Sequence, residues 1–119
     1  MSLVFVYGTL KRGCSNHHHL AGQTFVGLAR TRPGFWLFDV GGFPGLVAHP
    51  TDADGVAGEV WLVDPGCLER LDELEGVAEG LYRRAGIPLE SPFAESAVEA
   101  YLYPHSIAGR TELGSSWNG

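Results

Sequence analysis

Apolar residues occur along the chain in short runs that are separated by glycine, proline and aspartate. Short runs of β-branched and aromatic residues, bounded by such turn residues, are typical of β-strands. We therefore expect about five to seven short strands. The candidate segments are 2–7, 24–31, 34–38, 44–48, 56–63, 81–89 and 97–103.

One segment, residues 65–75, changes to the spacing of an amphipathic helix. Asp64 is a good N-cap, and Pro65 is favourable at the first helical position. Gly76 is expected to end the helix. The apolar residues at helical spacing are Cys67, Leu68, Leu71 and Leu74.

The composition is consistent with many short strands and few helices. The chain has 119 residues, which suits one domain, and its 17 glycines and 7 prolines suit tight turns. A short helix is also expected over 17–21, with Ser15 or Asn16 as its cap and Gly22 after its end. The predicted fold class is therefore α+β, a small mixed β-barrel with flanking short helices, formed by a single domain over 1–119.

The charge of the chain argues against two classes of partner. The formal net charge is −6, whereas non-specific binding to nucleic acid requires lysine and arginine to neutralise phosphates. No run approaches the ~18 apolar residues of a membrane helix, and the first residues do not resemble a secretory signal. We therefore expect a cytoplasmic protein that binds neither nucleic acid nor membrane, with Cys14 and Cys67 as inert thiols.

The first strand runs directly into a glycine turn in the sequence VFVYGTLKRG, residues 4–13. The outer glycine spacing is that of a phosphate-binding P-loop, but Cys14 follows where that motif needs lysine. A glycine after a strand also allows successive backbone N–H groups to form a concavity for an anion or oxyanion. The alternative is a plain tight turn at Gly8, with Lys11 and Arg12 as a solvated charged pair.

One acidic residue of the expected helix lies close to its apolar face. At about 100° per residue, Glu75 lies between Leu68 and Leu71 on the helical wheel, whereas Glu73 lies almost opposite the apolar stripe. Burial raises the pKa of a carboxyl group, which lets it accept and donate a proton near neutral pH. The alternative is a helix-terminal side chain that turns into solvent.

The histidines and tyrosines are less informative. His17, His18 and His19 are consecutive, so their imidazoles point in three directions, and no acidic or cysteine cluster stands beside them. We expect them to be solvated or to cap a helix, and we expect no metal site. Tyr82 and Tyr103, taken individually, are expected to pack rather than to react.

Together these motifs resemble the gamma-glutamylcyclotransferase-like superfamily, and especially its gamma-glutamylamine cyclotransferase branch. The resemblance extends from Val4 to Tyr103 in the order of the family motifs, and the Ser115–Trp117 segment is similar to the usual ending. The matching segments are YGTL at 7–10, Lys-Arg-Gly at 11–13, Asn16-His17, LDELEG at 71–76, Tyr82-Arg83 and Tyr101-Leu102-Tyr103.

The resemblance implies a compact mixed barrel and an enzyme that releases 5-oxoproline and a free amine from a gamma-glutamyl compound without a metal or cofactor. It implies that Glu75 acts first as general base and then as general acid. The expected partner is a small gamma-glutamyl molecule, and the expected assembly is a monomer or weak homodimer. The residues implied to bind substrate are Tyr7, Gly8, Thr9, Leu10, Tyr82 and Tyr103.

Two other functions are less consistent with the sequence. A binding or interaction module could keep the pocket without turnover, but such a module would have little reason to bury an unpaired acid such as Glu75. A barrel that binds oligonucleotides conflicts with the negative charge. The sequence leaves open which amine is released.

Overall fold

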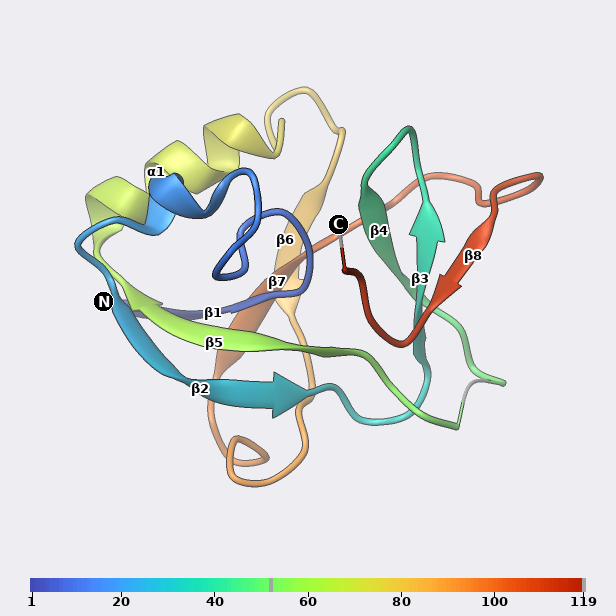
Figure 1. The fold of residues 1–119 in the computed structure, drawn as a ribbon, viewed down its shortest axis with the longest axis horizontal. Helices are drawn as coiled ribbons and strands as arrows, with labels where there is room; N and C mark the ends of the chain where they lie inside the picture. Colours follow the sequence, from blue (N-terminus) through green and yellow to red (C-terminus); the bar gives the residue numbers. More distant parts are fainter. Residues whose placement is uncertain (52, 119) are drawn as a thin grey trace.

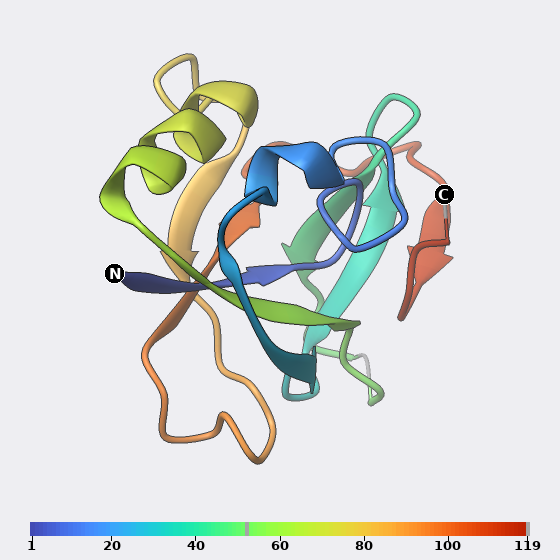
Figure 2. The same ribbon diagram turned by 60° about the vertical axis from the view of Figure 1, so that its left-hand side comes forward.

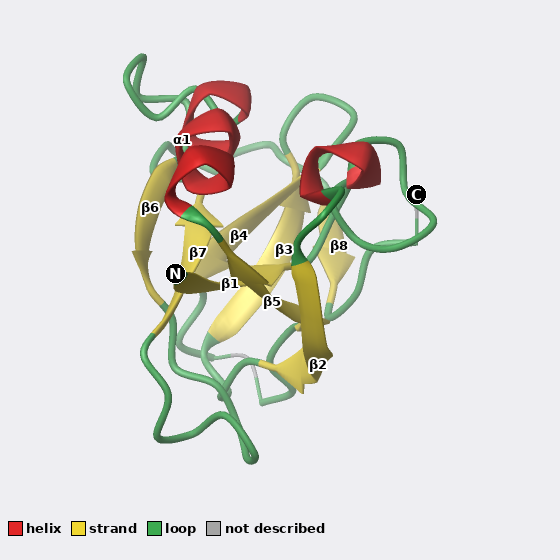
Figure 3. Ribbon diagram, turned by 90° about the vertical axis from the view of Figure 1, so that its left-hand side faces the viewer, coloured by secondary structure: helices red, strands yellow, loops and turns green. Residues whose placement is uncertain are grey.

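The structure is a computed structural model, and it describes residues 1–51 and 53–118. Its strands form one strongly curved mixed sheet, with α1 and the short 3-10 helix η1 at the same end of it (Figure 3). The elements are β1 Ser2–Val6, η1 His17–Leu20, β2 Thr24–Arg30, β3 Phe35–Asp39, β4 Pro44–Ala48, β5 Ala57–Val63, α1 Pro65–Leu74, β6 Arg83–Gly86, β7 Val98–Leu102 and β8 Glu112–Gly114.

The sheet is organised around β1, which pairs antiparallel with β5 and parallel with β7. Its second half, from Val4 to Val6, is buried, because apolar side chains pack on both faces of this central strand. Phe5 belongs to one cluster of buried residues, whereas Val4 and Val6 belong to a second cluster that includes Cys67 and Leu71 of α1. The core is therefore divided between the two faces of the sheet.

The sheet does not close into a complete barrel. The order of paired strands is β2-β5-β1-β7-β4-β3-β8, with β6 added on β7, so this path ends at β2 and β8. Figures 1 and 2 show β3, β4 and β8 as a separate wing of the molecule, on the side away from α1. The predicted α+β class, with a small barrel-like mixed sheet, is confirmed, although the sheet has one strand more than the expected range.

The two halves of the sheet meet through a buried tyrosine. Strands β4 and β7 share a single register pair, Leu46 with Leu102. Beside it, the Tyr7 hydroxyl donates to the Tyr101 carbonyl at 2.6 Å and accepts from the Leu46 N–H at 3.3 Å. The hydroxyl of Tyr7 therefore bridges two strands where the backbone ladder between them is short.

The predicted helix forms with the predicted cap. The Asp64 carboxylate accepts a hydrogen bond from the Cys67 N–H at 2.7 Å, and Pro65 is the first helical residue. At the other end, Gly76 has a φ of +64°, and the Val77 N–H donates to the Asp72 carbonyl at 3.0 Å. This is a Schellman end, which requires the left-handed conformation that glycine adopts readily. Among the described residues, no helix is both long and apolar enough to span a membrane.

Two expected elements differ from the structure. The strand predicted over 81–89 is shorter, Arg83–Gly86, because residues 81–82 belong to the loop that follows α1 and Pro88 cannot donate a ladder hydrogen bond. The 17–21 helix is a single 3-10 turn, His17–Leu20. A third difference is β8, which lies outside all the segments predicted as strands and pairs antiparallel with β3.

Candidate functional site

A pocket of about 200 Å³ lies where β1, the end of α1 and the β3–β4 turn converge. Most of the residues that the resemblance implied are found in its wall, so residues from the start and from the second half of the sequence line one cavity. The lining residues are Phe5, Val6, Tyr7, Gly8, Thr9, Leu10, Asn16, Phe43, Pro44, Leu74, Glu75, Leu81, Tyr82 and Tyr101.

The turn after β1 forms one wall of the pocket. The Lys11 N–H donates to the Gly8 carbonyl at 3.1 Å, which closes a tight turn around Thr9 and Leu10. Neither the Thr9 N–H nor the Leu10 N–H has a hydrogen-bond acceptor among the described residues. Both residues line the pocket, so these N–H groups remain available to a bound carboxylate or carbonyl oxygen.

Neighbouring side chains hold this turn from the η1 side. The Asn16 side-chain amide donates to the Thr9 hydroxyl at 3.0 Å, and the Asn16 N–H donates to the Thr9 carbonyl at 2.9 Å. The His17 Nδ1 atom lies 3.0 Å from the Leu10 carbonyl, and its ring packs edge-on against Trp61. The first histidine of the triplet therefore supports the turn.

Glycine is needed at position 8 because the chain packs tightly there. A Cβ atom on Gly8 would lie 2.7 Å from Cγ of Pro44, closer than real Cβ contacts allow. Pro44 also lines the pocket, and its carbonyl accepts a hydrogen bond from the Tyr82 hydroxyl at 2.9 Å. The glycine thus lets the turn approach the β4 side of the pocket.

Arg12, which follows the turn, is held by the Glu59 carboxylate. The Glu59 carboxylate accepts from the Arg12 N–H at 3.2 Å, from Arg12 Nε at 3.0 Å and from Trp61 Nε1 at 3.1 Å. The Arg12 guanidinium also lies 3.8 Å from the centre of the Phe25 ring. One alternative from the sequence was that Lys11 and Arg12 form a solvated charged pair. Arg12 instead makes these specific contacts.

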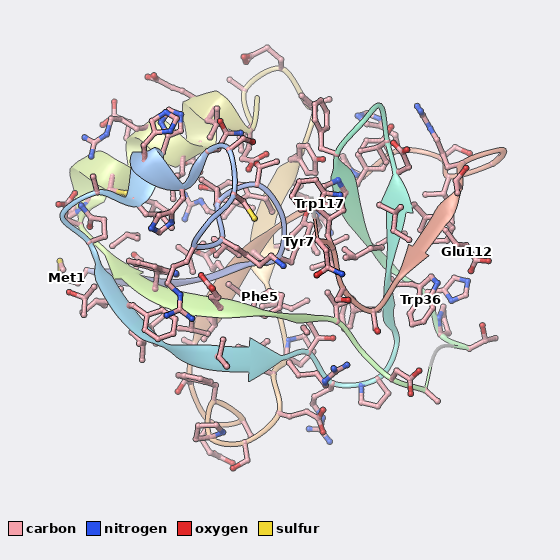
Figure 4. All side chains as sticks on the ribbon, viewed as in Figure 1. Met1, Phe5, Tyr7, Trp36, Glu112 and Trp117 are labelled. Carbon is pink, nitrogen blue, oxygen red and sulfur yellow. The ribbon has the colours of Figure 1, made fainter. Side chains whose placement is uncertain are left out.

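Lys11 anchors the turn to the end of the chain. The C-terminal segment returns to the middle of the molecule after β8 (Figure 1), and Figure 4 labels Trp117 on this segment. The Lys11 Nζ atom donates to the Trp117 carbonyl at 2.5 Å. The Trp117 side chain packs against the core cluster that contains Phe5 and Tyr7. The last residues therefore help to fix the turn.

Glu75 faces the same pocket from the end of α1. It is the C-cap residue, and its backbone N–H donates to the Leu71 carbonyl at 2.9 Å. Its half-buried carboxylate has no hydrogen bond or ion pair within the described part of the chain. Burial raises the pKa of Glu75 from 4.5 to about 7. The carboxylate that the helical wheel placed close to the apolar face of the helix is thus unpaired, and it is near the midpoint of its titration at neutral pH.

Three tyrosines near the pocket have different roles. Tyr82 lines the pocket as expected, and burial raises its pKa. Tyr103 was expected to line the pocket, but it is not among the lining residues: its ring packs edge-on against Tyr82, at 5.8 Å between ring centres. Tyr101 takes a place in the wall instead, and its hydroxyl donates to Asp72 at 2.8 Å. Tyr103 follows the last residue of β7 and packs, partly buried, against the core cluster that contains Tyr82.

The sequence did not identify every residue that shapes the site. Glu59 could have been noticed, because it is the one acidic residue in the apolar strand predicted over 56–63. An acid that is buried there needs hydrogen-bonding or charged partners. Phe43 and Leu81 gave no such signal, since both lie in loops whose positions depend on the folded chain. Asn16 belongs to one of the segments that match the family, but the residue pattern alone predicted only that it would cap a helix.

The described residues contain no group of three or more histidine, cysteine, aspartate or glutamate side chains that could hold a metal ion. The rings of His18 and His19 lie 4.2 Å apart between centres, and neither lines the pocket. The polar groups that line the pocket are the Glu75 carboxylate, backbone groups, the hydroxyls of Thr9 and of the tyrosines, and the Asn16 amide.

Comparisons with known proteins identify the family of the chain. The family model described as "Gamma-glutamyl cyclotransferase, AIG2-like" matches residues 4–118. A Vibrio cholerae protein named "Putative gamma-glutamylcyclotransferase" is 42% identical over 113 residues, which cover 94% of this chain and 92% of that protein. The human protein named "Gamma-glutamylaminecyclotransferase" is 35% identical over 120 residues, with 87% of this chain and 78% of that protein covered.

Solved structures show the same fold. An AIG2-like protein from Mus musculus superposes with a TM-score of 0.71 at 30% identity, covering 89% of this chain and 78% of that one. A uropathogenic E. coli-specific protein superposes with a TM-score of 0.80 at 25% identity, covering 98% and 91%. By sequence over nearly its whole length and by fold, the chain belongs to the AIG2-like gamma-glutamyl cyclotransferase family.

Proposed function

We propose that this protein is a gamma-glutamyl cyclotransferase that converts a gamma-glutamyl amine into 5-oxoproline and the free amine, with Glu75 as its base and acid. The observation that carries the proposal is the position of the unpaired Glu75 carboxylate, which faces the Thr9–Leu10 turn across one pocket. Family membership supports the reaction class. The substrate and the roles of individual residues are our inference.

The reaction begins with the α-amine of the substrate, which is an ammonium group at neutral pH. Glu75 removes a proton from it, and the free amine then attacks the γ-carbonyl carbon, forming the C–N bond of a five-membered lactam. The carbonyl oxygen becomes an oxyanion, and the free N–H groups of Thr9 and Leu10 are suited to stabilise it. A substrate folded by the pocket gains the advantage of an intramolecular reaction.

The tetrahedral intermediate then collapses. Protonated Glu75 donates its proton to the departing nitrogen and the original C–N bond breaks. The attacking nitrogen loses its second proton, which the released amine takes up to become an ammonium group, and 5-oxoproline is left. A pKa of about 7 supports this two-way transfer, because the group can hold or release a proton at little cost near neutral pH.

The test compares Glu75→Gln with Glu73→Gln, in which the neighbouring exposed carboxylate is replaced. Each protein is incubated with gamma-glutamyl amines and amino acids, including γ-glutamyl-ε-lysine, and 5-oxoproline is quantified. We expect Glu75→Gln to lower kcat by about 10²–10⁴-fold and Glu73→Gln to retain activity. Equal turnover by wild type and Glu75→Gln would remove Glu75 from the mechanism.

A further inference from the structure

Three large apolar side chains are exposed around the mouth of the pocket. Phe43 in the β3–β4 turn is 47% exposed, Leu74 at the end of α1 is 37% exposed and Leu81 in the following loop is 46% exposed. All three line the pocket. The β3–β4 turn and the loop after α1 stand at the same end of the molecule in Figure 1, and the views in Figures 2 and 3 agree. We call these three residues the apolar rim.

The helical wheel predicted Leu74 for the buried stripe of α1, together with Cys67 and Leu71. The structure buries Cys67 and Leu71 completely but exposes Leu74, so this part of the prediction is wrong. Leu74 precedes Glu75 and lines the pocket at the last residue of α1. Its exposure therefore provides apolar surface next to the carboxylate rather than packing within the core.

The rim is held in a defined geometry. The Leu81 N–H donates to the Gly76 carbonyl at 3.0 Å, and a Cβ atom on Gly76 would lie 3.0 Å from the Leu81 Cβ. The loop that carries Leu81 is thus packed against the left-handed end of α1. On the other side, the Phe43 carbonyl accepts a hydrogen bond from the Val40 N–H at 3.0 Å, and Phe43 precedes Pro44, which packs against Gly8 of the binding turn. The rim residues are therefore placed by the same turns that position Glu75 and Gly8.

The charges around the pocket favour a neutral group at the rim. Glu75 is the sole lysine, arginine, aspartate, glutamate or histidine among the described lining residues. The nearby Asp72 carboxylate is occupied by Arg84, at 2.9 Å from Nε, and by the Tyr101 hydroxyl. Within the part of the chain that the structure describes, no lysine or arginine lines the pocket to pair with a second carboxylate of a substrate. An apolar group would meet complementary surface there, and an amino-acid head group would not.

We infer that the apolar rim of Phe43, Leu74 and Leu81 binds the departing amine, and that the preferred substrates are gamma-glutamyl amides of apolar alkyl or arylalkyl amines. This inference rests on the proposed function and specifies its substrate class. The gamma-glutamyl group occupies the inner part of the pocket between Glu75 and the Thr9–Leu10 turn. The apolar part of the amine lies outside it and removes rim surface from water.

The test measures kcat/KM for four substrates: γ-glutamyl methylamide, γ-glutamyl isopentylamide, γ-glutamyl phenethylamide and γ-glutamyl-ε-lysine. Added apolar groups change kcat/KM by roughly 10-fold or more when a pocket binds them. We therefore expect the isopentyl and phenethyl amides to exceed the methylamide and the lysine compound by about tenfold. The Phe43→Ser and Leu81→Ser variants should each lower the phenethylamide-to-methylamide ratio by about threefold or more.

Leu28→Ser is the matched control, because Leu28 is 70% exposed on β2 and does not line the pocket. Its ratio should equal that of wild type. Equal kcat/KM for methylamide and apolar amides, or an unchanged ratio in both rim variants, would overturn the inference and leave the proposed function standing. Failure of wild type to release 5-oxoproline from any substrate, the methylamide included, would overturn the proposed function and the inference with it.

Discussion

Two glutamates on opposite sides of the binding turn have opposite environments. Glu59 is 6% exposed, yet its carboxylate accepts hydrogen bonds from the Arg12 N–H, the Arg12 guanidinium and the Trp61 indole. Burial alone would raise the pKa of Glu59, but these hydrogen bonds and the arginine charge outweigh it, and the pKa is lowered. Glu75 is also desolvated, has no such partners among the described residues, and its pKa rises to about 7.

The comparison shows that burial by itself does not identify a reactive acid. A buried carboxylate with hydrogen-bond donors is a structural element, and here Glu59 fixes the outer side of the turn. A buried carboxylate without donors can exchange a proton near neutral pH. The difference lies in the donors supplied by other parts of the chain, which is why the mechanism assigns the proton transfer to Glu75.

The largest expected effect concerns stability as a function of pH. Below pH 4.5 the Glu75 carboxyl is protonated in the folded and unfolded states; between 4.5 and about 7 the folded state retains a proton that the unfolded state has lost. The free energy of unfolding contributed by this group therefore decreases as pH rises through that window, by about 3 kcal/mol in total. Glu75→Gln should lack this decrease, as measured by urea denaturation at pH 4.5, 6 and 8.

The same titration should appear in the activity of the enzyme. Because the base must be deprotonated in the free enzyme, kcat/KM should fall as pH drops below about 7. A profile that stays flat down to pH 5 would show that Glu75 does not have the environment described, and the contrast with Glu59 would then fail.

A smaller effect is expected at Glu59. In Glu59→Gln one oxygen remains an acceptor, but the new amide places a donor against Arg12 Nε, so the ion pair is lost. We expect the free energy of unfolding to decrease by about 2 kcal/mol. The matched control is Glu69→Gln, an exposed residue on α1, which should change stability by less than about 0.5 kcal/mol. A Glu59→Gln protein as stable as this control would show that the Arg12 contacts contribute nothing.

The smallest effect extends the comparison to a neutral buried group. Tyr7→Phe removes the hydroxyl that joins the Tyr101 carbonyl to the Leu46 N–H, and it should lower the free energy of unfolding by about 1 kcal/mol. Tyr103→Phe is the control, because the Tyr103 hydroxyl has no hydrogen bond among the described residues. Thermal or chemical denaturation of the pair measures the difference, and equal losses would argue against a bridging role for Tyr7.

Much of the fold could be predicted because local signals agree with it. The apolar runs identify the paired strands, and Asp64, Pro65 and Gly76 set both ends of α1, as the structure confirms. Strand β8 could not be predicted, since Glu112–Gly114 has little apolar character and is extended because it pairs with β3. Its register depends on where the rest of the sheet has folded.

The site was partly predictable for a related reason. The turn and Glu75 were found from a motif and from helical geometry, which are local features. Other features depend on contacts between segments far apart in the sequence. They are the presence of Tyr101 rather than Tyr103 in the pocket wall, the contacts of Glu59 with Arg12, and the apolar rim. Helical periodicity places Leu74 on the apolar stripe, but it does not reveal that this side chain is exposed and lines the pocket.

An NMR titration of the side-chain carboxyl carbons of Glu75 and Glu59 in the folded protein tests the role of Glu75 most directly. We expect a pKa of about 7 for Glu75 and a pKa for Glu59 below its ordinary value of 4.5. If Glu75 titrates near 4.5, its carboxylate is solvated or paired, and the central claim that it is the proton-transferring group of this pocket is contradicted.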